Sequence, residues 1–200
     1  MSLRRASLAL LFSLSLIAPA AAQSLAVDVH VASSSWSEFD GTDVGVGGRI
    51  TVKPLPMIGI DADLTWYPGD FPGDKVVPFS GQRFEGMFGA TLGPTLGRMR
   101  PFVKAGGGFL NIGDTPRAYA CVAIFPPPLS CTLAAGQTLP AWEFGGGIEI
   151  AASSKAFLRA DISDRLLKYP GVTLGSDRQR HDNAYYGGAL RFTLGAGLRF

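Results

Sequence analysis

The chain has 200 residues, which is enough for one domain, and its formal net charge is only +2. This balance, without a basic cluster, argues against nucleic acid as a partner. Beyond the first 22 residues there is no run of 18 consecutive apolar residues, so we expect no membrane-spanning helix in that part of the chain.

The N-terminus predicts a cleaved signal peptide. Arg4 and Arg5 form a basic start, residues 6–17 are apolar, and three alanines precede Gln23 as a small-residue cleavage site. Removal of the two arginines leaves the mature chain with equal numbers of basic and acidic residues. We therefore expect a signal peptide over 1–22 and one exported domain over 23–200.

Seven stretches in chain order alternate between apolar and polar residues: 25–32, 44–53, 58–67, 83–92, 102–109, 142–150 and 156–162. Such alternation has the period of a β-strand that buries one face. The connections after the second, fourth and sixth stretches are short, and Pro54-Leu55-Pro56 is expected to end the second strand. The other connections are long, at roughly 34–43, 68–80, 112–139 and 168–182.

The last stretch, 183–200, has the clearest alternation and ends in Phe200. It brings the number of expected strands to eight. Short turns at one rim and long loops at the other are typical of barrels that cross a membrane. The sequence therefore predicts an all-β protein, an eight-stranded antiparallel up-and-down transmembrane β-barrel.

The glycine-rich strand 101–108, the strand 157–161 and the terminal Phe200 are similar to those of the OmpA-like and OmpX-like small outer-membrane β-barrel superfamily. This resemblance covers the mature chain. It implies a bacterial outer membrane with extracellular loops, outer-membrane lipid and lipopolysaccharide as surroundings, and a barrel-assembly machinery that recognises the last strand with Phe200 as its signal. A peptidoglycan-binding domain follows the barrel in the OmpA type; the sequence ends at Phe200, so peptidoglycan binding is not expected.

The polar face of the strands is expected to line the interior, because a Lys or Arg facing lipid near the midplane costs about 2–4 kcal/mol. Seven bases and seven acids share that face, which favours pairing in an interior with little room beyond its own side chains. We expect the lumen to be plugged and non-conducting. The expected lumenal charge network is Asp28, Arg49, Lys53, Asp61, Asp63, Arg83, Glu85, Lys104, Glu143, Glu149, Arg159, Asp161, Arg191 and Arg199.

Aromatic residues on the apolar face cluster at the long-loop ends of their strands. Trp66, Phe84, Trp142 and Tyr186 predict an aromatic girdle at the outer interface of the membrane. A soluble, lipocalin-like barrel with this face inside is the alternative architecture. It would have to enclose more bulk than an eight-stranded interior holds.

Cys121 and Cys131 lie in one segment of an exported chain, which favours a disulfide over a metal site. If the glycine triplets centred on Gly107 and Gly146 lie opposite each other in a hairpin, the two cysteines fall in the same register within one residue. The bridge would then present residues 123–129 as an exposed apolar tip.

No residues in the sequence indicate catalysis, a cofactor or a metal. His30 and Asp28 share the lumenal face, but no Ser-His-acid set is evident. No helix follows either glycine triplet, so neither is expected to bind phosphate. We predict a structural or surface-binding role through the loops with an unidentified extracellular partner, and Arg178 and Arg180 are candidates to contact lipopolysaccharide phosphates. A lipid-modifying enzyme, as known among lipid A deacylases and palmitoyltransferases of this fold, and a small-solute channel remain as alternatives.

Overall fold

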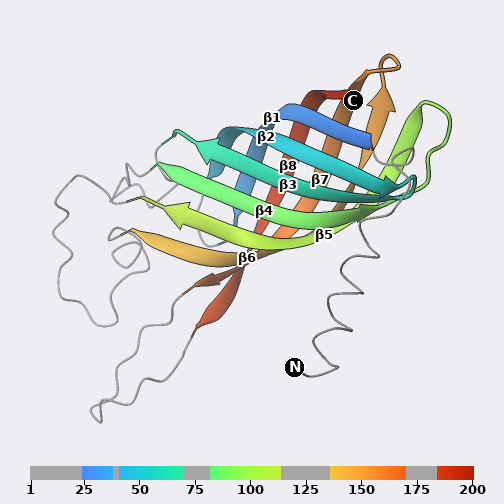
Figure 1. The fold of residues 1–200 in the computed structure, drawn as a ribbon. Helices are drawn as coiled ribbons and strands as arrows, with labels where there is room; N and C mark the ends of the chain where they lie inside the picture. The colour runs from blue at the N-terminus through green and yellow to red at the C-terminus, as the bar shows by residue number, and fades with distance from the viewer. Residues whose placement is uncertain (1–23, 38–40, 70–81, 114–135, 170–183) are drawn as a thin grey trace, which may run out of the picture.

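The computed structural model describes residues 24–37, 41–69, 82–113, 136–169 and 184–200. These residues form eight strands, which close into one barrel in chain order, with β8 paired back to β1 (Figure 1). Every pairing is antiparallel. The strands are β1 (Ser24–Trp36), β2 (Thr42–Leu55), β3 (Ile58–Tyr67), β4 (Arg83–Leu92), β5 (Met99–Ile112), β6 (Gln137–Ala151), β7 (Ala156–Tyr169) and β8 (Tyr185–Arg199).

The predicted fold class is therefore confirmed, and the alternation of residues explains it. On β1, Asp28 and His30 are buried in the interior, whereas Val29 and Val31 on the opposite face are 69% and 53% exposed. The other strands also alternate buried polar residues with exposed apolar ones, so the outer wall is apolar and the interior polar. The described part of the chain contains no helix with the length and apolar composition needed to cross a membrane.

The strands reach further toward the loop rim than the alternation indicated. β3 and β4 have the expected bounds, but β1 continues to Trp36 and β2 already begins at Thr42, with Ser35 opposite Thr42. The long connection expected over 34–43 is thus wrong. Serines and Thr42 interrupt the apolar pattern without interrupting the backbone ladder, which needs only free N–H and C=O groups.

Pro54 does not end β2, contrary to expectation. The strand continues to Leu55, which pairs with Ile58, and the register shifts between Val52 and Leu55. An irregularity of this kind accommodates a proline because a bulged residue need not donate to the ladder.

The two glycine triplets are not opposite each other. Gly107 pairs with Trp142 and Gly146 with Val103, so the triplets are displaced by four residues along the β5–β6 pair. This register removes the basis for placing Cys121 opposite Cys131. Both cysteines lie outside the described residues, and their disulfide stays a prediction.

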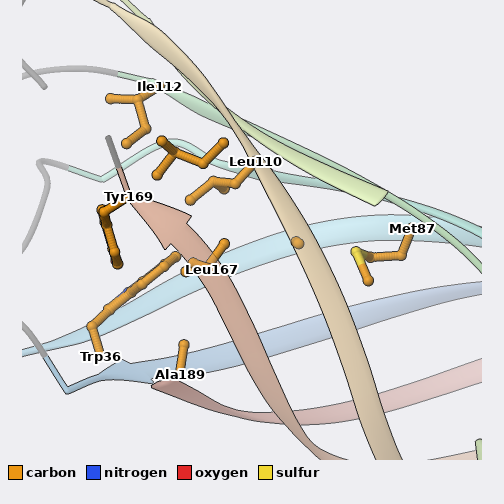
Figure 2. Close-up of a cluster of buried hydrophobic side chains, with 9 residues drawn as sticks. Trp36, Met87, Leu110, Ile112, Leu167, Tyr169 and Ala189 are labelled. Atoms are coloured by element: carbon orange, nitrogen blue, oxygen red, sulfur yellow. The ribbon is translucent and has the colours of Figure 1, made fainter. Parts of the chain in front are cut away.

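An apolar layer occupies the interior near the loop rim (Figure 2). Trp36 from β1 and Leu167 and Tyr169 from β7 lie near one another in this layer. All members are buried, so apolar packing contributes to the interior at this end of the barrel. The complete set is Trp36, Met87, Leu110, Ile112, Leu139, Ala141, Leu167, Tyr169 and Ala189.

Candidate functional site

Charged side chains meet in the middle of the barrel interior. Arg49 on β2 donates from Nε to Asp63 Oδ2 at 3.0 Å, and from Nη1 to Asp161 Oδ2 on β7 at 3.1 Å. Asp161 also accepts a 2.5 Å hydrogen bond from Lys104 Nζ on β5. Two bases thus share one carboxylate, which joins three walls of the barrel.

A second group of ion pairs surrounds Arg191 on β8. Its Nη2 donates to Asp63 Oδ1 at 3.1 Å and to Thr65 Oγ1 at 2.5 Å, and its Nη1 lies 3.2 Å from Glu85 Oε1. Glu85 in turn forms an ion pair with Arg165. Because Asp63 also binds Arg49, this group and the previous one form one continuous network.

Further pairs lie toward the two rims. Near the loop rim, Arg83 Nε donates to Asp43 Oδ2 at 2.8 Å, and both side chains are fully buried. Near the short-turn rim, Lys53 Nζ donates to Glu149 Oε1 at 2.8 Å, and Arg199 also binds that carboxylate. The ion pairs therefore extend along most of the barrel axis.

Aromatic rings cover two of the arginines near the short-turn rim. The guanidinium carbon of Arg159 lies 4.4 Å from the ring centroid of Phe102, and that of Arg199 lies 5.1 Å from that of Phe157. Both rings are buried, so each contact is a partly desolvated cation–π interaction, which adds to the ion pairs.

The structure places all fourteen residues of the expected lumenal network inside the barrel. Thirteen are at most 9% exposed; Arg199, at the rim, has a side chain that is 28% exposed. A charge buried in this way is costly unless it is paired and hydrogen-bonded, which explains why bases and acids interleave across the lumen.

Three further charged residues in the interior were not predicted from the sequence: Asp43, Arg100 and Arg165. Each lies an even number of positions from an inward-facing residue of its own strand. Extending the alternation along the strand would therefore have assigned all three to the interior. Asp43 fell in the connection expected over 34–43, whereas Arg100 and Arg165 lie just outside the alternating stretches 102–109 and 156–162.

His30 lies inside this network and not at a surface. Its Nε2 is 3.0 Å from Thr65 Oγ1 and 3.2 Å from Arg191 Nη2, and its Nδ1 is 3.6 Å from Asp28 Oδ1. His30 is 5% exposed and Thr65 is fully buried, so a substrate has no access to either. Within the described residues, no His, Cys, Asp and Glu side chains group as metal ligands.

Little free space remains at the centre of the lumen. The cavity there measures about 20 Å³ and is lined by Arg49, Asp61, Asp63, Met87, Gly89, Ala90, Lys104, Ala105 and Glu143. A single water needs about 10–15 Å³ of such space, so this cavity has room for about one water.

The four residues expected to form the aromatic girdle face outward near the loop rim, each 37–57% exposed. Trp66 on β3 is directly opposite Phe84 on β4. Trp142 on β6 and Tyr186 on β8 form an edge-to-face contact, with ring centroids 5.7 Å apart. The signal peptide, Cys121, Cys131, Arg178 and Arg180 lie outside the described residues.

An apolar outer wall around an ion-paired interior defines this fold as an eight-stranded transmembrane β-barrel. The chain is similar to the crystal structure of Neisserial surface protein A, with a TM-score of 0.55 and 13% identity, over 89% of this chain and 97% of that one. It is also similar to the outer membrane protein OprG from Pseudomonas aeruginosa, with a TM-score of 0.52 and 12% identity, over 90% and 96% of the two chains. At these identities the likeness shows the fold alone. No family model matches the sequence, and no curated protein matches it significantly.

Proposed function

We propose that this protein is a closed, non-enzymatic barrel of the bacterial outer membrane, which presents its long connections to an extracellular partner. The observation that carries the proposal is the network of ion pairs that crosses the middle of the interior, where the cavity measures about 20 Å³. The apolar layer around Trp36 and Leu110 lies on the loop side of these pairs. An interior occupied by side chains at both levels supports anchoring over transport.

The membrane location is supported by the outward side chains. Val29, Phe88 and Val103 are each more than 60% exposed on the outer wall, where water would leave a large apolar surface unburied. Lipid is the solvent that makes such a surface favourable. One solved structure of similar fold is described as an outer membrane protein and another as a surface protein.

Conductance in planar bilayers tests the closed lumen. The unmutated barrel is expected to give no sustained current. A variant in which Arg49, Lys104 and Asp161 are replaced by Ser, and Trp36, Leu110 and Tyr169 by Ala, opens both the ion-paired level and the apolar layer; it serves as the positive control, with measurable current expected. Steady, reproducible single-channel currents from the unmutated, folded barrel would overturn the proposal in favour of a small-solute channel.

Two further measurements separate binding from lipid chemistry. Lipid A from cells with and without the protein is expected to be identical by mass spectrometry, because His30 is enclosed in the lumen. Intact barrels displayed on cells are expected to capture a partner that a barrel with shortened connections does not. A change in lipid A that depends on the protein would support a lipid-modifying enzyme instead.

A further inference from the structure

A cavity of about 210 Å³ opens at the short-turn end of the barrel, separate from the small central cavity. Residues from five of the strands and from the β2–β3 and β4–β5 turns line it. The lining set is Ser24, Lys53, Pro56, Thr95, Gly97, Arg98, Met99, Arg100, Glu149, Ala151 and Arg199. Since a water needs only about 10–15 Å³, this space admits a small polyatomic group together with several waters.

The charges that line this cavity do not balance. Lys53, Arg98, Arg100 and Arg199 are basic, and Glu149 is the one acid among the described lining residues. The rest of the interior pairs its bases and acids, so an excess of positive charge at this position departs from the pattern of the barrel. A site with that excess attracts an anion.

The single acid is already engaged. Glu149 accepts hydrogen bonds from Lys53 Nζ, at 2.8 Å to Oε1 and 3.2 Å to Oε2, and from Arg199. Arg100 Nη1 lies at the limit of an ion pair, 4.0 Å from Glu149 Oε2. One carboxylate therefore partners Lys53 and Arg199 and leaves Arg100 largely uncompensated.

Arg100 has buried hydrogen-bond donors that point to a missing acceptor in the cavity. It is only 3% exposed, and its Nη2 donates to Met57 O at 3.2 Å and to Thr91 Oγ1 at 3.4 Å, which fixes the guanidinium in place. Its Nε and Nη1 find no hydrogen-bond acceptor among the described residues. Unsatisfied buried donors are costly, so an acceptor with more than one oxygen would be stabilised beside them.

Arg98 is positioned at the mouth of the same cavity by the β4–β5 turn. Gly97 adopts a φ of 61°, which an L side chain rarely does, and the turn is closed by reciprocal hydrogen bonds between Leu96 and Met99. The Nε and Nη2 of Arg98 donate to the carbonyls of Ala151 and Ala152 at 3.1 and 2.8 Å. The side chain is thus held against the next turn, with its charge at the cavity.

From these observations we infer that the short-turn mouth of the barrel is a binding site for a phosphate group. A phosphate group spreads its negative charge over several acceptor oxygens, which suits the planar donors of two arginines better than a second carboxylate beside Glu149 would. The short-turn rim lies at the inner leaflet if the loops are extracellular, so the phosphate can come from a phospholipid headgroup or from free phosphate in the periplasm.

The experiment uses the full mature barrel folded in uncharged maltoside micelles, in phosphate-free buffer. In one arm, inorganic phosphate is titrated in and the heat of binding is measured. In the other, micelles contain phosphatidylglycerol, and native mass spectrometry measures the lipid that stays bound. Binding in either arm is expected, and which arm responds identifies the source of the phosphate.

The variants test whether the binding occurs in this cavity. R98Q and R100Q are each expected to weaken phosphate binding about tenfold, the effect of losing a charge-assisted contact. E149Q is expected to tighten it, because the competing negative charge is removed. K155Q, which alters a base in the β6–β7 turn that does not line the cavity, is the matched control and is expected to leave the affinity unchanged.

Folding of every variant is checked by its heat-modifiable mobility on gels. If R100Q fails to fold, R98Q and E149Q still test the inference, since Arg98 is exposed and its side chain donates only to the carbonyls of Ala151 and Ala152 among the hydrogen bonds described. Absence of binding both at millimolar inorganic phosphate and in the phosphatidylglycerol micelles would overturn the inference. An affinity that R98Q and E149Q leave unchanged, or that K155Q lowers equally, would overturn it as well.

Discussion

Arg159 on β7 donates from Nη2 to Asp61 Oδ2 on β3 at 2.7 Å, across the full width of the barrel. The two residues are 98 positions apart in sequence, and their strands lie on opposite sides of the ring. Lys53 and Glu149 join β2 to β6 in the same way, as Glu85 and Arg191 join β4 to β8. Side chains therefore brace the barrel across its lumen, in addition to the backbone ladder around it.

The first prediction concerns this cross-lumen pair. R159M is expected to destabilise the barrel by about 3–5 kcal/mol, since it leaves Asp61 buried without its base. The double variant R159M/D61N is expected to cost less than R159M alone, because no uncompensated carboxylate remains at position 61. Urea unfolding of the barrel in lipid vesicles, followed by tryptophan fluorescence, measures both. Equal costs for the single and double variants would contradict the pairing.

A second prediction uses the three tryptophans. Trp66 and Trp142 are 37% and 38% exposed on the outer wall, whereas Trp36 is 4% exposed in the lumen. In variants that keep one tryptophan each, lipids with a quencher near the headgroup are expected to quench Trp66 and Trp142 to a similar extent and Trp36 hardly at all. Stronger quenching of Trp66 or Trp142 by a label at mid-bilayer would rule out their position at the interface.

Gly197 provides a third test, of packing inside the barrel. A Cβ at this position would lie 2.5 Å from Val27 O and 2.6 Å from both Asp28 Cβ and Phe157 Cζ. G197A is therefore expected to lower the free energy of unfolding by about 1–3 kcal/mol through overpacking. At Gly107 the nearest atom would be 3.6 Å away, so G107A is the control and is expected to be neutral or slightly stabilising. Similar losses in both variants would contradict this account.

The fourth prediction separates assembly from stability at Phe200. Its ring is 74% exposed, and its backbone N–H donates to Leu25 O at 2.8 Å, a bond that substitution leaves intact. F200A is expected to reduce the amount of heat-modifiable, folded barrel in the outer membrane while leaving export and the stability of the folded barrel unchanged. L198A, at another outward apolar position of β8, is the control and is expected to assemble normally. Normal assembly of F200A would exclude its role as a signal.

The sequence was sufficient to predict the closed barrel and which residues face its interior, because a period of two assigns every side chain of a strand to one face. It was insufficient at the strand ends. Ser34, Ser35 and Thr42 pair in the ladder although their side chains give no apolar alternation. The interior positions of Asp43 and Arg165 went unrecognised for that reason.

The pairing register of β5 and β6 was also predicted wrongly, for a physical reason. Glycine triplets carry no side chains whose size or charge favours one alignment over another, so Gly107 and Gly146 gave no information on how β5 pairs with β6. The sequence also could not predict which base pairs with which acid. Residues such as Arg159 and Asp61 meet only because the closed ring places β7 opposite β3.

The apolar layer of Trp36, Leu110, Leu139, Leu167 and Tyr169 lies on the loop side of the ion pairs that Asp61, Asp63 and Asp161 form in the middle of the lumen. Substitutions in the connections after β1, β3, β5 and β7 therefore need not disturb the charges that brace the barrel. The architecture thus divides the chain into connections whose sequence can vary and interior positions whose charges and volumes are constrained. For engineering, the same division makes the barrel a scaffold onto which foreign loops can be grafted.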